Sequence, residues 1–454
     1  MCKSYKILIL SSYPPDRSAG LAQDYINAFQ KEGHEVDFLT LYGYPNRGGN
    51  EHCVYPEHLS TRVQRWANRY PILQLLRPNK NEFLRTIKNK ILKHPSDGNS
   101  VWNNGLYIPN IDERIPPVDI NSIIQVLPKN NYDFVYVIFM QRMLTTATLL
   151  AIYEKLHVPI LIAGVDMASF TGGCFYFGNC ERYMQKCGKC PILQSDDDND
   201  QTRRNFEFKQ DVYKKIQCAY LCNSYQKKFV DKSGIFSHTI VQTLSILLDE
   251  KKFLPLDMAE SRKYFSIPDK KQFVIFSRYA GQKHTRAKGY DHLVTIINQF
   301  VEKLDSFSLQ ECLLVLAGVK DVEFESLFNM DIMNVGSLDM DELIKMYSAS
   351  SVFISTSIDD AGPSMVNQSM MCGTPVVTFS IGTSLDVIKN GRSGYMVENY
   401  NDDDFADGIY KIYTLQNTDY INLRGNTRNE ALKHNTSKVI IKKITDVYEQ
   451  IISK

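Results

Sequence analysis

Short apolar segments alternate with helical patterns in two separate parts of this chain, and this alternation limits the folds open to it. The first series has an apolar strand at 6–10, a loop at 12–20, a helical pattern at 21–32 and a second strand at 36–41. A strand, a helix and a strand in this order predict a parallel βαβ unit. The loop after the first strand then lies at the carboxyl edge of the sheet, where parallel sheets bind their ligands.

The second series begins after a linker at 248–271 and repeats the same pattern. Its apolar strands fall at 273–277, 313–317, 352–356 and 375–379. Two such series predict an α/β protein with two doubly wound, Rossmann-like domains that face a cleft. The first domain would span 1–247 and the second 248–437, and a final helix at 438–454 would pack back on the first domain.

The charge of the chain is balanced, because 52 Lys and Arg residues stand against 51 Asp and Glu residues, for a formal net charge of +1. This balance excludes a globally basic nucleic-acid-binding protein, so we expect no nucleic acid partner. No segment approaches the roughly 18 consecutive apolar residues that a membrane-spanning helix needs. The apolar run near the N-terminus is too short for a signal peptide, and polar residues follow it at once. We interpret it as the first buried strand of a cytoplasmic protein.

A basic segment at 62–93 interrupts the first series, with nine basic residues and one acidic residue. Its apolar residues Phe83, Leu84 and Ile87 would share one face of a helix. One interpretation is an interfacial patch on anionic lipid, which would place the protein peripherally on the inner membrane face. The other is an ordinary helix whose basic face is solvated.

Two segments of the second series carry a resemblance to a known family. Residues 355–364 read STSIDDAGPS and run into MMCGTPVV at 370–377, and residues 385–395 read LDVIKNGRSGY. Together they resemble the donor half of GT-B glycosyltransferases of family 4, the "glycosyl transferases group 1" domain. The Cys-rich insert at 170–191 resembles a subset of that family that builds bacterial capsule and exopolysaccharide.

The resemblance implies a retaining glycosyltransferase of the hexosyltransferase type. Such an enzyme moves a sugar from a nucleotide diphosphate donor to a glycan or lipid-linked glycan acceptor in surface polysaccharide synthesis, without a catalytic metal. Cleavage of the sugar–diphosphate bond leaves negative charge on phosphate, which cationic side chains and helix N-termini must then stabilise.

The resemblance places an Arg and a Lys after the first strand of the donor domain. Arg278 closes that strand, and Lys288 opens the next helix. Their spacing is longer than the family's usual one, so Arg286 and Lys283 remain alternatives to Arg278. Solvated loop charges are the other interpretation of these cations.

A helix at 364–371 would present its free N–H groups to the same phosphates. Gly362 allows a close backbone approach, Pro363 suits a helix start, and Ser364 begins the helix. An ordinary turn into a helix is the alternative. In the first domain, Gly20 lies in a loop that resembles the family loop touching donor phosphate and acceptor.

Two positions depart from the family's pattern. Its two Glu residues, which contact the sugar and the ribose, correspond to Asp360 and Gln368, so one carboxylate becomes an amide. Its His-Asp pair corresponds to Val165 and Asp166, and a valine cannot take over a histidine's role. Asp166 would lie near the acceptor or serve as a turn cap. The rival hypothesis is therefore a catalytically impaired binding or partner subunit that keeps the GT-B fold.

Four of the 10 cysteines cluster in the insert, with five, six and two residues between them. The last pair forms a Cys-x-x-Cys turn, and four thiolates would close a tetrahedral structural zinc site without an open catalytic position. Reduced packing cysteines, a disulfide and an iron–sulfur site remain alternatives. The residues are Cys174, Cys180, Cys187 and Cys190.

Overall fold

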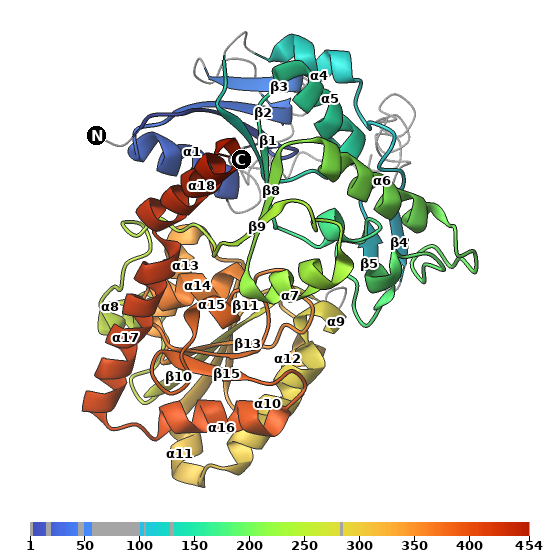
Figure 1. The fold of residues 1–454 in the computed structure, drawn as a ribbon. Helices are drawn as coiled ribbons and strands as arrows, with labels where there is room; N and C mark the ends of the chain where they lie inside the picture. The colour runs from blue at the N-terminus through green and yellow to red at the C-terminus, as the bar shows by residue number, and fades with distance from the viewer. Residues whose placement is uncertain are drawn as a thin grey trace, which may run out of the picture.

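The computed structural model describes residues 3–14, 20–43, 50–56, 100–103, 106–127, 131–281 and 285–453. These residues form two α/β domains, one above the other in Figure 1, each built on a parallel sheet. This arrangement confirms the two doubly wound domains expected from the sequence. None of the helices in the described ranges has the length and apolar character that crossing a bilayer requires.

The first domain has a seven-stranded parallel sheet in the order β3-β2-β1-β6-β7-β8-β9. Its strands are β1 (Lys6–Ser11), β2 (Glu35–Gly43), β3 (Glu51–Pro56), β6 (Phe134–Val137), β7 (Ile160–Ala163), β8 (Cys218–Cys222) and β9 (Ile240–Thr243). Its helices are α1 (Leu21–Lys31), α4 (Ile120–Val126), α5 (Thr146–Leu156), α6 (Gln201–Lys215) and α7 (Ser224–Ser233). A hairpin of β4 (Val101–Asn103) and β5 (Leu106–Ile108) and the short helices η3 (Ala168–Phe170) and η4 (Arg182–Gln185) complete it.

The central strands of this sheet are buried on both faces, as parallel sheets require. In β1, Leu8 and Leu10 point into one apolar core, and Ile7 and Ile9 point into another on the opposite face. All four side chains are fully buried. Burial on both sides explains why this strand is continuously apolar rather than alternating.

The second domain has a six-stranded parallel sheet in the order β12-β11-β10-β13-β14-β15. Its strands are β10 (Phe273–Tyr279), β11 (Cys312–Gly318), β12 (Ile332–Gly336), β13 (Val352–Ser355), β14 (Val376–Phe379) and β15 (Gly394–Val397). Its helices are α8 (Met258–Tyr264), α9 (Thr285–Lys288), α10 (Tyr290–Glu302), α11 (Ser306–Glu311), α12 (Val322–Glu325), α13 (Met340–Ala349), α14 (Ser364–Met371), α15 (Ser384–Val387), α16 (Asp402–Tyr413) and α17 (Asn417–Asn435).

The last helix, α18 (Ser437–Ile452), leaves the second domain and returns to the first. Figure 1 shows it, in dark red, beside the blue α1. Its apolar face, with Ile440, Ile444 and Val447, belongs to the core that also contains Ile7 and Ile9 of β1. The C-terminus of the chain therefore completes the core of the N-terminal domain.

Candidate functional site

The strand order of the second sheet fixes where a ligand can bind. The chain runs outward in opposite directions from β10 and β13, which are neighbours, so the loops after these two strands diverge. Ligands of parallel sheets bind in the crevice at such a switch point. A cavity of about 400 Å³ lies there, and its lining includes Arg278, Lys288, Asp360, Gly362 and Ser364. The structure thus brings together most of the residues expected to bind the donor.

Lys288 and Asp360 form an ion pair on the wall of this cavity. The Lys288 ammonium lies 2.5 Å from Oδ2 of Asp360, whose side chain is buried. The negative charge of Asp360 raises the pKa of Lys288, while burial opposes that shift. The other oxygen of Asp360 accepts a hydrogen bond from the backbone N–H of Gly362 at 3.0 Å. Asp360 therefore positions both the cation and the loop that leads to α14.

The backbone beside Lys288 is held against the end of β13. Gly289 has a φ of 62°, and a Cβ added to it would lie 2.0 Å from the carbonyl oxygen of Thr356. The Thr356 hydroxyl donates to the Lys288 carbonyl at 3.0 Å. Only glycine fits this close approach, which places the Lys288 side chain over the switch point.

Arg278 is exposed at the end of β10, where its guanidinium nitrogen lies 4.0 Å from the sulfur of Met365. Arg278 and Lys288 both line this cavity, and the charge of Arg278 partly opposes the rise that Asp360 causes in the pKa of Lys288. Lys283 and the side chain of Arg286 lie outside the described residues. Of the three alternatives, Arg278 is the one whose side chain the structure describes, and it lines the cavity.

The start of α14 faces the same cavity. Pro363 is its N-cap and provides no side-chain hydrogen bond to the first turn. Ser364 and Met365 line the cavity together with Lys288 and Arg278, so the helix begins at the cavity wall. Uncapped N–H groups at a helix start are a good site for phosphate oxygens.

A second cavity, of about 240 Å³, lies between the two domains and shares Gly362 and Ser364 with the first. Its lining includes Val165 and Gln368. The Gln368 side-chain oxygen accepts a hydrogen bond from the hydroxyl of Tyr347 at 3.1 Å. Gln368 thus lies one turn beyond Ser364, on the interdomain cavity and not on the lining of the larger one, and its contact with a ribose stays a prediction.

Asp24 also lines the interdomain cavity, although no sequence motif singles it out. It lies in the first turn of α1 and is half-buried. Burial raises its pKa to about 6, while the charge of Lys252 acts in the opposite direction. An acidic residue in a first helical turn ordinarily indicates no more than a favourable interaction with the helix dipole, so the pattern could not reveal its position in the cleft.

Asp166 lies on the first-domain side of the cleft in a buried polar cluster. Its carboxylate accepts hydrogen bonds from the Gln141 side chain at 3.0 Å and from the Ala168 backbone at 2.8 Å. Burial raises its pKa to about 6, Glu113 acts in the same direction, and Lys209 opposes both. Asp166 thus serves as a turn cap. Its carboxyl group is also buried, with the charged groups of Glu113 and Lys209 nearby.

Three adjoining cavities connect Lys288 with Asp166. The third, of about 20 Å³, is lined by Asp166, Glu113 and Lys209. It shares Ala163 and Val165 with the interdomain cavity. A donor bound near Lys288 and an acceptor bound near Asp166 would therefore meet in the interdomain cavity.

Gly20 is the N-cap of α1 and has a φ of 75°. A Cβ at this position would meet nothing within 4 Å, so no neighbouring atom requires a glycine here. The positive φ alone favours glycine. Its neighbour Leu21 lines the interdomain cavity. Gly20 itself is not among the residues that line this cavity, and its contact with donor phosphate stays a prediction.

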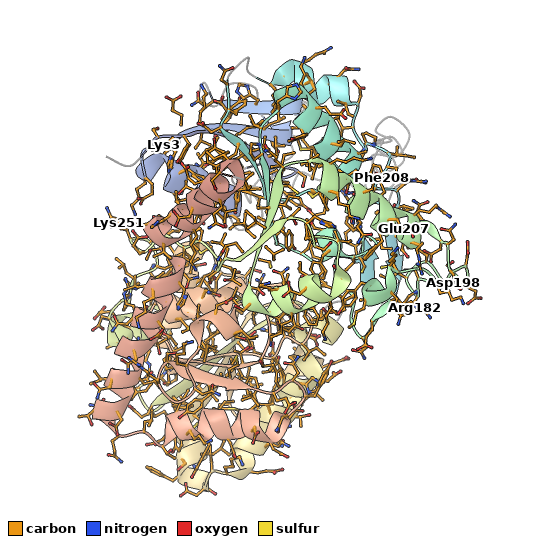
Figure 2. All side chains as sticks on the ribbon, in the orientation of Figure 1. Lys3, Arg182, Asp198, Glu207, Phe208 and Lys251 are labelled. Atoms are coloured by element: carbon orange, nitrogen blue, oxygen red, sulfur yellow. The ribbon has the colours of Figure 1, made fainter. Side chains whose placement is uncertain are left out.

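The four clustered cysteines surround a separate small cavity beside η4, about 30 Å³ in volume. Each is a free thiol, and burial raises the pKa of Cys187 to about 12. Figure 2 shows Arg182 and Asp198 in the outer part of this region, with their side chains directed to solvent. In the described part of the chain, no three His, Cys, Asp or Glu side chains already stand in a metal-binding arrangement. The basic segment 62–93 lies outside the described residues.

Direct hydrogen bonds join the two domains beside the loop between β13 and α14, residues 356–363, which we call the donor loop. The side chain of Asn223, which caps α7, donates to the carbonyl of Ala361. The backbone N–H of Ser224 donates to Asp386 at 3.2 Å, and the Ser224 hydroxyl donates to the same carboxylate. These contacts join the end of β8 to both the donor loop and α15.

Comparisons with known proteins find a family match within the second domain. Residues 257–434 match the family described as "Glycosyl transferases group 1". A D-inositol 3-phosphate glycosyltransferase of Arthrobacter sp. is 27% identical over 172 residues, which cover 37% of this chain and 40% of that protein. An uncharacterized glycosyltransferase of Methanocaldococcus jannaschii is 23% identical over 158 residues, covering 33% of this chain and 38% of that protein. The chain thus matches about two fifths of the length of these curated relatives.

Solved structures show that the likeness of fold extends over the whole chain. Sucrose-phosphate synthase from Thermosynechococcus elongatus aligns with a TM-score of 0.62 and 14% identity, covering 99% of both chains. HepE of Anabaena in complex with UDP and glucose aligns with a TM-score of 0.56 and 11% identity, covering 98% of this chain and 100% of that one. The chain has the GT-B fold of these proteins, and its residues 257–434 match the model of the glycosyl transferases group 1 family.

Proposed function

We propose that this protein is a retaining glycosyltransferase that moves a sugar from a nucleotide diphosphate donor to a glycan or lipid-linked glycan acceptor in surface polysaccharide synthesis. The observation that carries the proposal is the placement of Lys288, Arg278 and the uncapped start of α14 around one cavity at the switch point. Two cations and a helix N-terminus form a site for a pyrophosphate. The structure of HepE of Anabaena was solved with UDP and glucose bound, which supports the donor class.

Each residue has a role that follows from its position. Lys288 and Arg278 would stabilise the negative charge that develops on the departing diphosphate. Without a metal, stabilisation of this charge is the largest contribution to lowering the barrier to cleavage. Asp360 holds Lys288 and Gly362 in place and would contact the sugar from the same wall. Asp166 would bind an acceptor hydroxyl. Retention of the anomeric configuration rests on the family resemblance.

A panel of nucleotide sugars tests the proposal directly. The purified protein would be incubated with UDP-, GDP-, ADP- and dTDP-linked hexoses, and release of the nucleoside diphosphate would be measured. We expect hydrolysis of one donor class, and we expect Lys288→Ala to lower its kcat/KM by about 100- to 1,000-fold. Lys303→Ala is the control, because Lys303 forms a surface ion pair with Asp407 away from the cavity.

The rival function, a catalytically impaired partner subunit, is favoured by Val165 and Gln368 at two positions of the cleft. Calorimetric titration with UDP, GDP and ADP distinguishes the two. Failure of every nucleotide to bind would support the partner subunit and contradict a donor site at Lys288. Binding of one nucleotide together with release of its sugar would establish the transferase.

We further propose that the protein acts in the cytoplasm, at the inner face of the membrane, where the basic segment 62–93 would contact anionic lipid. The support is its composition of nine basic residues and one acidic residue. Co-sedimentation with phosphatidylserine-containing vesicles, weakened by added salt, is the expected result. Equal pelleting with neutral and anionic vesicles would contradict it.

A further inference from the structure

The cysteine-rich segment between η3 and α6 contains little regular structure. Among the described residues, η4 is its one helical turn. Its first part packs on the core of the first domain through Phe177 and Tyr183, whereas the part after η4 has only a small apolar core of Ile108, Cys190 and Ile192. The part after η4 therefore buries little apolar surface of its own.

Four thiols from this segment surround one enclosed space. Cys174 and Cys180 precede η4, and Cys187 and Cys190 follow it. All four line the same cavity of about 30 Å³. This volume exceeds the ~10–15 Å³ that a single water molecule requires.

Backbone amides already point at two of the sulfurs. The N–H of Gly172 donates to the sulfur of Cys187 at 3.2 Å. The N–H groups of Ile192 and Leu193 donate to the sulfur of Cys190. Hydrogen bonds of this kind stabilise negative charge on sulfur and orient metal-ligating groups. A neutral packing cysteine gains little from them.

The turn that carries the Cys-x-x-Cys pair is held in an unusual conformation. Lys186, Cys187 and Lys189 have φ values of 66°, 61° and 44°, and the intervening Gly188 has a φ of 91°. A Cβ at Gly188 would lie 2.2 Å from the carbonyl oxygen of Asp198, so the turn is also pressed against the next loop. Non-glycine residues rarely adopt this conformation, and those that do cluster at functional sites.

From these observations we infer that Cys174, Cys180, Cys187 and Cys190 bind one structural metal ion of the kind that prefers thiolates, which includes zinc and iron. The thiols stand around the cavity without a metal-binding arrangement of any three of them, so binding requires their side chains to rotate toward a common centre. Each ligating thiol loses its proton on binding, and a divalent ion with four thiolates carries two negative charges.

This site is structural and separate from the proposed transfer reaction. Four protein ligands leave no open coordination position for a substrate. The metal would instead fix the cysteine-rich segment, which follows the turn at Asp166 directly along the chain. The Lys209 ammonium donates hydrogen bonds to the carbonyls of Ala168 and Thr171 and so holds the connection between that turn and the segment. Loss of the metal would thus loosen the first-domain wall of the cleft.

Elemental analysis tests the inference on the full chain purified under reducing conditions. We expect one metal ion per chain, and the zinc and iron signals distinguish the two kinds of ion. After removal of the metal by a mercurial reagent and a chelator, cobalt(II) alone should bind and give the intense absorption of tetrahedral thiolate coordination. The thermal midpoint should fall on metal removal and return with zinc.

Matched variants locate the site. Cys187→Ala should abolish stoichiometric metal binding, whereas Cys372→Ala, at a buried cysteine of the second domain, should retain it. If Cys187→Ala does not fold, the cobalt spectrum of the wild-type protein still decides the question. Clearly substoichiometric amounts of every metal, both as purified and after reconstitution, would overturn the inference, as would full metal content in a folded Cys187→Ala variant.

Discussion

Lys288 and Asp360 form an ion pair on the wall of the larger cavity. Under the proposed function, an incoming diphosphate would compete with Asp360 for the same cation. The second oxygen of Asp360 is held by the Gly362 backbone, which keeps the carboxylate in place when Lys288 turns toward phosphate. The pair therefore balances two requirements: a positioned cation, and a wall that is not so positive that the product nucleotide stays bound.

Replacing Asp360 by Asn separates these requirements. Asn keeps an oxygen for the Gly362 N–H but removes the charge that Lys288 faces. Because a partly exposed ion pair contributes about 1 kcal/mol or less, we expect Asp360→Asn to bind the nucleoside diphosphate roughly five-fold more tightly and to transfer sugar more slowly. Calorimetry and initial rates measure the two effects. Weaker nucleotide binding in this variant, with Asp407→Asn unchanged as the surface control, would contradict the competition.

The pKa of Asp166 makes stability depend on pH. Burial raises this pKa from 3.8 in an ordinary environment to about 6 in the folded protein. The carboxyl group is protonated in both states below pH 3.8, so it has no effect there. As the pH rises from 3.8 toward 6, the unfolded chain loses the proton first, and the charge that the folded chain must later bury destabilises it.

Asp166→Asn removes that charge. We expect the variant to gain stability relative to the wild type as the pH rises from 4 to 7, by at most about 3 kcal/mol. Urea unfolding at both pH values gives the difference. Asp211→Asn is the control, since Asp211 is exposed on α6 and pairs with Lys215. An equal difference between variant and wild type at pH 4 and pH 7 would show that the Asp166 carboxylate is not penalised by burial.

At the scale of single elements, the break between α9 and α10 places Lys288. Gly289 separates the two helices, and its contact with Thr356 leaves no room for a side chain. We expect Gly289→Ala to lower the free energy of unfolding by at least about 2 kcal/mol, because it combines a positive φ with a backbone clash. It should also reduce donor hydrolysis, since Lys288 would move with the displaced backbone.

Gly425 provides the matched control for this prediction. It lies within α17, with open space where its Cβ would be. Gly425→Ala should therefore stabilise the protein by about 0.5–1 kcal/mol and leave donor hydrolysis unchanged. Denaturant unfolding and nucleotide release measure both variants. Similar effects of the two substitutions would contradict a special role for the Gly289 backbone.

The sequence predicted the central strands better than the edge strands. The strand at 273–277 is a continuous apolar run because β10 is buried between two neighbours, and it was recognised. β12, at the edge of the same sheet, has every residue half-buried, so its polar and apolar residues give no clear pattern. β9 has the same character at the edge of the other sheet, and it was missed for the same reason.

The sequence predicted site residues only where they lie in a local motif. Lys288, Asp360 and Gly362 fall in such segments, and the structure brings them to one cavity. Asp24 reaches the cleft only because α1 packs against the first sheet, and no spacing along the chain encodes that approach. Ser224 is an ordinary first residue of a helix until its partner in the other domain is known.

At the scale of the whole molecule, the two domains are joined by different kinds of contact at two places. The apolar face of α18 is buried in the first domain, which makes this connection permanent. Beside the donor loop, hydrogen bonds join Asn223 to Ala361 and Ser224 to Asp386, and Tyr225 of α7 packs against the edge of the second domain's core. The geometry therefore allows the cleft to open at the donor loop while the domains stay attached through α18.

The bond between Ser224 and Asp386 should then favour the closed cleft. Ser224→Ala and Asp386→Ala each remove it from one side, and we expect either variant to populate a more open form. Small-angle scattering should show a larger radius of gyration, and the KM for the donor should rise several-fold, since closure brings the first domain to the bound sugar. Asp407→Ala, which removes a surface ion pair of the second domain, should change neither quantity.

The double variant distinguishes a shared contact from two separate effects. If the two residues act through one bond, Ser224→Ala adds little to the change already caused by Asp386→Ala, because the interaction is lost with either partner. Full additivity, or scattering profiles identical to that of the wild type, would mean that the closed arrangement does not depend on this contact. The closing force would then have to come from the Asn223 bond to the donor loop itself, and Asn223→Ala would be the variant that opens the cleft.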